Sequence, residues 1–110
     1  MTKATAKSKF VRVRPRKARL AADLIRGLTV DDAAQQLRYS QLKAGKLILK
    51  TLESAIANAE SQHDARREDL IVTEVRIDNG PSFKRSKPKN KGGSHPIVKR
   101  TSHITISVEE

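Results

Sequence analysis

The chain contains no cysteine and no tryptophan, and its aromatic residues are two phenylalanines and one tyrosine. The absence of cysteine excludes disulfides, thiolate zinc sites and cysteine nucleophiles, and it suits a reducing cytoplasm. No apolar run approaches the roughly 18 residues of a membrane span, and the basic first ten residues lack the apolar stretch of a signal peptide. We therefore expect a soluble, unprocessed, cytoplasmic protein that does not enter a membrane.

The sequence also lacks the patterns that support catalysis. Its three histidines, His63, His95 and His103, are far apart and have no metal-ligand spacing. There is no glycine-rich phosphate loop and no nucleophile elbow. Because no nucleophile, base and orienting partner can be assembled, we expect no enzyme, no metal, no cofactor and no small-molecule substrate.

Acidic residues are missing from two segments of a chain whose net charge is +11. Residues 1–20 carry eight Lys or Arg side chains and no acid, and residues 84–100 carry seven and no acid. The stretch between them, 21–83, holds eight basic and ten acidic residues, so all the excess charge lies in the two segments. Such self-repulsion indicates a polyanionic partner, with nucleic acid as the leading candidate.

A solubilising surface or an anionic membrane could also account for positive charge of this size. A basic surface kept for solubility usually intersperses both signs instead of emptying whole segments of acid. An anionic membrane surface would require Trp or Phe beside the lysines, and this chain has few aromatic residues. Both fit the distribution of charge less well than nucleic acid does.

Apolar periodicity predicts three helices, a first from Pro15 to Gly27, a second over about 30–39 and a long third over about 41–61. Thr29 followed by Asp32 resembles a capping arrangement for the second helix. The expected inward stripe of the first helix is Ala18, Ala21, Leu24, Ile25 and Leu28. Small residues in "SAIANAE" mark the third helix as the packing centre.

Alternating apolar residues predict three strands. A short one at 11–14 would place Val11 and Val13 on one face, and the last one alternates at Ile104, Ile106 and Val108. In "LIVTEVRID" the face expected to be shared is Ile71, Thr73, Val75 and Ile77. The predicted fold class is a single α+β domain over 1–110, with three helices on a small three-stranded antiparallel sheet, a basic tail at 1–9 and a long protruding β-hairpin at 80–103.

Most of this hairpin offers nothing that can be buried, and at about 3.3 Å per residue its arms would project on the order of 30 Å. Its composition is compatible with a disordered linker. It is equally compatible with an arm that becomes ordered among phosphates, because each Lys or Arg that meets a phosphate releases counterions. Phe83, Ile97 and Val98 favour the arm, since isolated apolar groups can stack on bases or fill a groove.

Four stretches together resemble one family, the bacterial ribosomal protein twenty-two of the large subunit. In order, they are "PRKARLAADLIRG", "SAIANAE", "DNGPSFKR" and "KRTSHITI". The resemblance implies a body seated beside the mouth of the nascent-peptide tunnel and a hairpin that threads inward through the RNA. The implied partners are large-subunit rRNA, neighbouring large-subunit proteins including ribosomal protein four, and the nascent polypeptide.

The resemblance also matches Arg16, Lys17 and Arg19 to the basic start of the family's first helix, and Lys84, Arg85, Lys99 and Arg100 to its basic arm positions. The residues expected to bind rRNA are Arg12, Arg14, Arg16, Lys17, Arg19, Lys84, Arg85, Lys87, Lys99, Arg100 and His103. Those expected to line the tunnel at the hairpin tip are Lys89, Asn90, Lys91, Gly92, Gly93, Ser94 and His95. The tip departs from the family in having lysine where several arginines are common, and lysine lacks the planar fork of arginine.

The primary hypothesis is therefore a structural, rRNA-binding constituent of the large ribosomal subunit. A free DNA-binding or nucleoid-associated protein is the alternative, favoured by charge alone. A catalytic role is the third class, and it would depend on His63 or His103.

Overall fold

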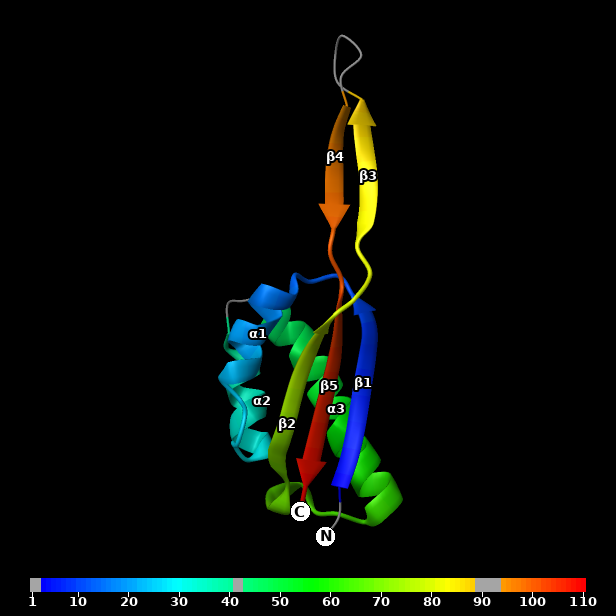
Figure 1. The fold of residues 1–110 in the computed structure, drawn as a ribbon. Coiled ribbons are helices and arrows are strands. Elements are labelled where there is room, and N and C mark those ends of the chain that lie inside the picture. Colours follow the sequence, from blue (N-terminus) through cyan, green and yellow to red (C-terminus); the bar gives the residue numbers. More distant parts are fainter. Residues whose placement is uncertain (1–2, 41–42, 89–93) are drawn as a thin grey trace.

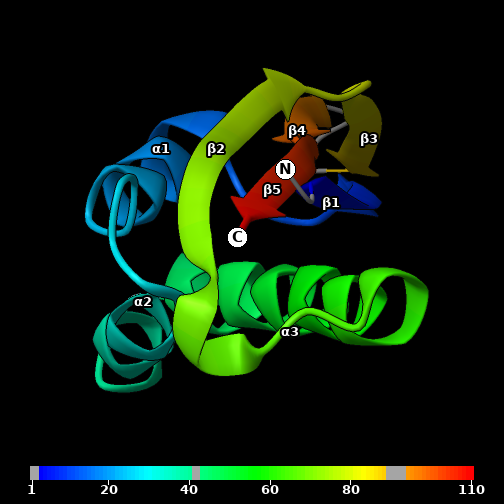
Figure 2. The ribbon, with the colours of Figure 1, turned by 90° about the horizontal axis from the view of Figure 1, so that it is seen from below.

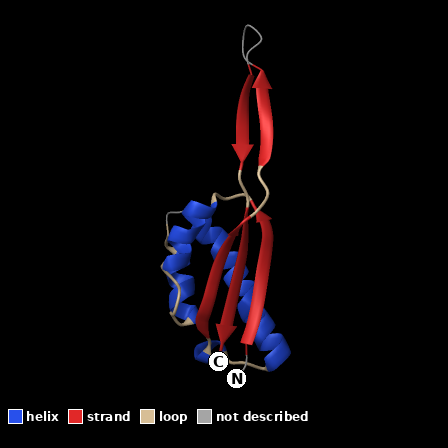
Figure 3. Ribbon diagram, in the orientation of Figure 1, coloured by secondary structure: helices blue, strands red, loops and turns tan. Residues whose placement is uncertain are grey.

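The computed structural model describes residues 3–40, 43–88 and 94–110, which form three α-helices, one short 3-10 helix and five strands (Figures 1 and 3). The elements are β1 (Lys3–Val11), α1 (Pro15–Asp23), α2 (Val30–Arg38), α3 (Lys43–His63), η1 (Arg67–Asp69), β2 (Ile71–Asn79), β3 (Phe83–Pro88), β4 (Ser94–Lys99) and β5 (Ser102–Glu109). This arrangement confirms the predicted α+β class.

A three-stranded antiparallel sheet in the order β1-β5-β2 forms the body, and a separate two-stranded sheet pairs β3 with β4. Helix α3 runs beneath β5 and β1, while α1 lies against β2 (Figure 2). Ile104, Ile106 and Val108 of the central strand are fully buried, as their alternation predicts. Burial of this face against α3 supplies the apolar core.

Helix α3 is the packing centre, as expected from its sequence. Ile48, Leu52 and Ile56 recur at helical spacing and are at most 2% exposed. Ala55 and Ala59 are fully buried, and their small side chains let the sheet approach closely.

The local signals for α2 and for the end of α1 are confirmed in part. Thr29 Oγ1 accepts a hydrogen bond from the Asp32 N–H at 3.3 Å, which caps α2. Gly27 has the left-handed φ of +86°, although α1 itself ends at Asp23. The prediction that Leu24 faces the core is wrong, because the helix unwinds before it and leaves its side chain 51% exposed.

The predictions for the N-terminal strand and tail are wrong in position. Residues 3–9, expected to be a tail, belong to β1, and residues 12–14 lie outside it. Alternating Ala4 and Ala6 are buried against α3, and Phe10 adopts a φ of +57° where the pairing with β5 shifts. The pairing resumes at Val11, where β1 ends, so the strand shares only the first residue of the segment in which it was expected.

A bulge also changes the predicted faces of β2. The pairing with β5 shifts between Val72 and Glu74, so the inward positions are Val72, Val75 and Ile77. Ile71, expected inside, is 44% exposed. A bulge adds one residue and reverses the faces on one side of it, which simple alternation does not reveal.

Strands β3 and β4 form an arm that continues β2 and β5 away from the body (Figure 1). The predicted limits 80–103 are too wide, because Ser102 and His103 pair with Asn79 and Asp78 inside the body sheet. Pro88 and Pro96 lie within the two-stranded sheet of β3 and β4. Proline is tolerated there only where the partner strand does not need the N–H that proline lacks.

The arm dominates the shape of the molecule. The principal extents of the whole chain are 62 × 25 × 16 Å. The radius of gyration is 16.9 Å, whereas a compact chain of this length has about 13 Å.

We predict that Leu52→Ala lowers the free energy of unfolding by about 2–5 kcal/mol, because it leaves a cavity beneath the sheet. Leu24→Ala, the same chemical change at an exposed position, should cost less than about 0.5 kcal/mol. Urea denaturation of both variants measures the difference. Equal losses would contradict the assignment of α3 as the packing centre.

Candidate nucleic-acid interface

The arm leaves the body through a joint between Gly80 and Thr101. The Gly80 N–H donates to the Thr101 carbonyl oxygen at 2.9 Å, and Thr101 Oγ1 donates to the Pro81 carbonyl oxygen at 2.7 Å. Thr101 is 1% exposed, so these hydrogen bonds are partly shielded from water. A Cβ at position 80 would lie 2.4 Å from Thr101 Oγ1, so only glycine fits. The joint ties both strands of the arm to the body.

A hollow beside this joint is lined by four arginines. Its volume is about 530 Å³, and it contains no acidic side chain. Arg19 is held here by Nη2, which donates to the Ile77 carbonyl oxygen at 3.2 Å and to Asn79 Oδ1 at 3.4 Å. The arginines are Arg14, Arg16, Arg19 and Arg100.

A second hollow, also of about 530 Å³, lies between the start of α1 and the start of α3. Its cationic residues are Arg12, Arg14, Lys17 and Lys43, and it too contains no acid. Arg14 lines both hollows, so the two are neighbours.

The N-terminus of α1 adds to the positive potential between these hollows. No side chain caps it, Pro15 occupies the first turn, and there is no acid in that turn. Unsatisfied N–H groups give a helix N-terminus a partial positive charge, which acidic residues normally offset. Here basic side chains take their place.

We call the exposed cations at this end of the body the arm-root face. Its members are Arg12, Arg14, Arg16, Lys17, Arg19 and Arg100, all of them predicted from the sequence. They come from the β1–α1 connection, the first turns of α1 and the arm base, and all are exposed.

The remaining predicted residues have different positions. His103 is partly buried, and its Nδ1 accepts a hydrogen bond from the Phe10 N–H at 3.1 Å while the two rings pack edge to face at 5.0 Å. Strand β3 carries Lys84, Arg85 and Lys87, and β4 carries Ser94, His95 and Lys99. The tip residues Lys89, Asn90, Lys91, Gly92 and Gly93 lie outside the described residues.

Sequence reasoning missed some cations. Lys43 joins the second hollow from α3, and Lys3, Lys7 and Lys9 are exposed on β1. The alternation of Lys3, Ala4, Thr5, Ala6 and Lys7 is the signal that could have revealed this strand. No local signal connects Lys43 with α1, because the contact is tertiary.

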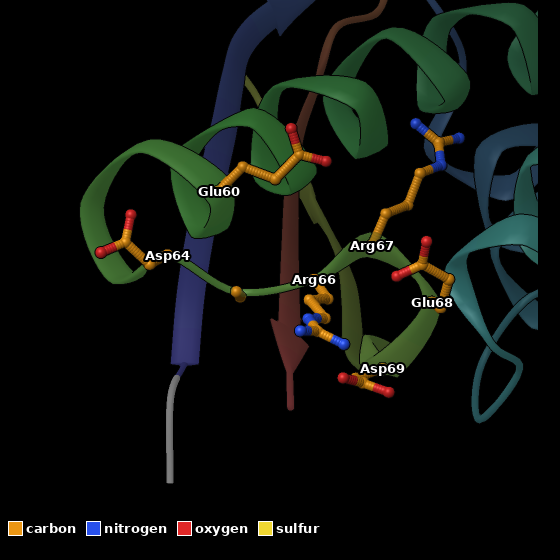
Figure 4. Close-up of a pocket in the computed structure, with 7 residues that line it drawn as sticks. Glu60, Asp64, Arg66, Arg67, Glu68 and Asp69 are labelled. Carbon is orange, nitrogen blue, oxygen red and sulfur yellow. The ribbon is translucent and has the colours of Figure 1, made fainter.

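A third hollow, of about 760 Å³, lies at the opposite end of the body between the end of α3 and η1 (Figure 4). It is lined by Glu60, Asp64, Glu68 and Asp69 together with Arg66 and Arg67. With more acids than bases, it does not suit a polyanion.

An ion-pair cluster holds η1 beside α2 and α3 at that end. Arg67 Nε lies 2.8 Å from Asp31 Oδ1, and its Nη1 lies 3.6 Å from Glu53 Oε2. The hydrogen bond that Arg67 donates to Asp31 raises the pKa of Arg67, and Glu53 adds to this against the opposing effect of desolvation. The guanidinium of Arg67 is thus already paired within the fold.

The part of the chain that the structure describes contains no cluster of His, Cys, Asp or Glu able to hold a metal ion. Among the same residues, no helix combines the length and apolar character needed to cross a membrane. These features define a class: a small α+β protein with cations at one end of its body and a protruding hairpin.

Comparisons with known proteins identify the family. A model of the family described as ribosomal protein L22p/L17e matches residues 6–109. The chain is 64% identical over 108 residues to the large ribosomal subunit protein uL22 of Protochlamydia amoebophila (strain UWE25), which covers 98% of this chain and 97% of the relative. It is 58% identical over 110 residues to the protein of the same name from Chlamydia pneumoniae, covering 100% and 97%.

The chain therefore belongs to the ribosomal protein L22p/L17e family. It is accordingly a structural constituent of the large ribosomal subunit, which is cytoplasmic in bacteria, and it is not an enzyme. The resemblance drawn from the four sequence stretches is confirmed.

We predict that Gly80→Ala lowers the free energy of unfolding by about 1–3 kcal/mol, because its Cβ displaces Thr101 Oγ1 from the Pro81 carbonyl oxygen. Adding Thr101→Ala removes the atom that clashes. The double variant should therefore be less destabilised than the sum of the two single variants. Urea denaturation of all four proteins measures this coupling; strictly additive losses would show that the two side-chain positions do not meet.

Proposed function

We propose that the chain binds large-subunit rRNA through the arm-root face and the basic residues of the arm. The convergence of six exposed cations from separate segments at the end from which the arm emerges carries this proposal. The proposed rRNA-binding residues are Arg12, Arg14, Arg16, Lys17, Arg19, Lys84, Arg85, Lys87, Lys99, Arg100 and His103.

Phosphate contact is the chemistry that this surface supports. Arginine presents a planar fork of donors that matches phosphate oxygens, and four arginines line one hollow. Contacts of this kind recognise the backbone and shape of a folded RNA rather than its sequence. For His103, an Nδ1 already engaged by Phe10 leaves the other ring nitrogen as the one available to RNA.

We further propose that the arm extends through the folded RNA and that its tip lines the nascent-peptide exit tunnel. The arm continues β2 and β5 beyond the body and pairs only with itself, which is the shape required to reach a distant wall. The proposed tunnel-lining residues are Lys89, Asn90, Lys91, Gly92, Gly93, Ser94 and His95. Neighbouring large-subunit proteins and the nascent chain are the further partners of this arrangement.

The rRNA contact predicts a change in salt dependence. Replacing Arg16 and Arg100 with Ala should weaken binding to large-subunit rRNA and reduce the slope of log affinity against log salt by about 1.5, because two phosphate contacts are lost. Filter binding across a salt series measures this slope.

The matched control replaces Arg38 and Arg66, two exposed arginines outside the arm-root face, with Ala. It removes the same charge and should leave the slope almost unchanged. If both pairs flatten the slope equally, net charge rather than the arm-root face governs binding.

The tunnel contact is testable because the chain has no cysteine, so one introduced thiol is unique. Asn90→Cys in assembled ribosomes should cross-link to a stalled nascent chain that carries a thiol-reactive group. Gln36→Cys, on the exposed side of α2, should not. Cross-linking from position 36 alone, or from neither position, would contradict the tunnel placement.

A further inference from the structure

The second hollow has a lining that is both cationic and apolar. Its apolar lining comes from Val13 and Ala44, which are 8% and 2% exposed, and from Leu20, which is 61% exposed. Its cationic lining comes from Arg12, Arg14, Lys17 and Lys43. A single exposed leucine is ordinary on a protein surface, but one that lines a cationic hollow indicates an amphipathic anion as the occupant.

A nucleotide has this combination of properties. Its base offers an apolar face, while its phosphates carry negative charge. The volume of about 530 Å³ falls within the range of roughly 300–1,000 Å³ that is usual for small-ligand sites. A fully paired helix would present only phosphates and sugar edges, so the base that reaches Leu20 must be out of its stack.

The position of the hollow connects it with the proposed rRNA surface. Arg14 lines this hollow and the arginine-lined hollow at the arm root, so one RNA strand can contact both without a break. The starts of α1 and α3 both lie at the end of the body from which the arm emerges (Figure 1). The strand that carries the unstacked base would then meet Arg12 in the second hollow and the other arginines in the first hollow, with Arg14 between them.

We propose that this hollow receives one unstacked nucleobase of the large-subunit rRNA, with its face on Leu20 and its flanking phosphates held by Arg12, Arg14, Lys17 and Lys43. This inference rests on the proposed rRNA binding and adds a base-binding pocket to it. Leu20 acts as a platform for the base, and the cations hold the strand in place.

The test compares Leu20→Ser with Leu24→Ser in complexes of the full chain with large-subunit rRNA. Both leucines are exposed and lie one turn apart, but only Leu20 lines the hollow. Base-directed reagents report the protected nucleobase, and hydroxyl radicals report protection of the backbone. Leu20→Ser should raise the reactivity of one protected base by about threefold or more, while the backbone protection around it persists.

Leu24→Ser should leave both patterns as in the unchanged protein, and Leu20→Phe should retain the base protection, because an aromatic ring is also a stacking platform. Equal base protection in Leu20→Ser and the unchanged protein would overturn the inference and indicate another occupant, such as an acidic peptide. Backbone protection would remain in that case, so the proposed function would stand. If the unchanged protein instead protects no part of the rRNA backbone, the proposed rRNA binding itself is refuted.

Discussion

Repulsion between like charges is the constraint on which the structure depends. Four arginines share one hollow at the arm root, and no acidic side chain lines it. Two unit charges about 10 Å apart repel by about 2 kcal/mol at an effective dielectric constant of about 20, and salt screens only part of this. A fold that gathers cations in this way gains stability when a polyanion neutralises them. The acidic residues that form ion pairs lie outside this hollow: Asp31 and Glu53 pair with Arg67, Glu74 and Asp78 with Arg76, and Asp23 with Arg26.

The body fixes the position of these cations relative to the arm. Its core holds β5 at the centre of the sheet, and β5 continues β4 of the arm through Thr101. Because Gly80 and Thr101 meet with no space for a Cβ, the arm leaves the body along a path set by the hydrogen bonds of Thr101 to Gly80 and Pro81. Arg19 is held beside this path by its hydrogen bond to the Ile77 carbonyl oxygen near the end of β2. The position of this cation relative to the base of the arm is therefore fixed.

Features that depend on local chemistry could be predicted from the sequence. The Thr29 cap, the long α3, the alternation of β5 and the two segments without acids all follow from neighbouring residues. β1 was harder to place, because its inward residues are alanines, whose alternation is a weak signal, and because Phe10 interrupts the regular pairing with a positive φ. The bulge near Val72 likewise reverses a pattern that reads as simple alternation.

The candidate site likewise has features that the sequence predicts and features that it does not. The cations from Arg12 to Arg19 could be predicted because their segment contains no acid. The apolar lining of the second hollow could not be predicted, because Val13, Leu20 and Ala44 come from three separate segments that only the fold brings together. Leu24 was predicted to be a core residue because the sequence pattern does not show that α1 ends before it.

An experimental density map of this chain within an assembled large subunit tests the central claim most directly. We expect rRNA phosphates within about 4 Å of the guanidinium groups of Arg14, Arg16, Arg19 and Arg100. If those groups instead face solvent or another protein, with no phosphate near them, the central claim is contradicted.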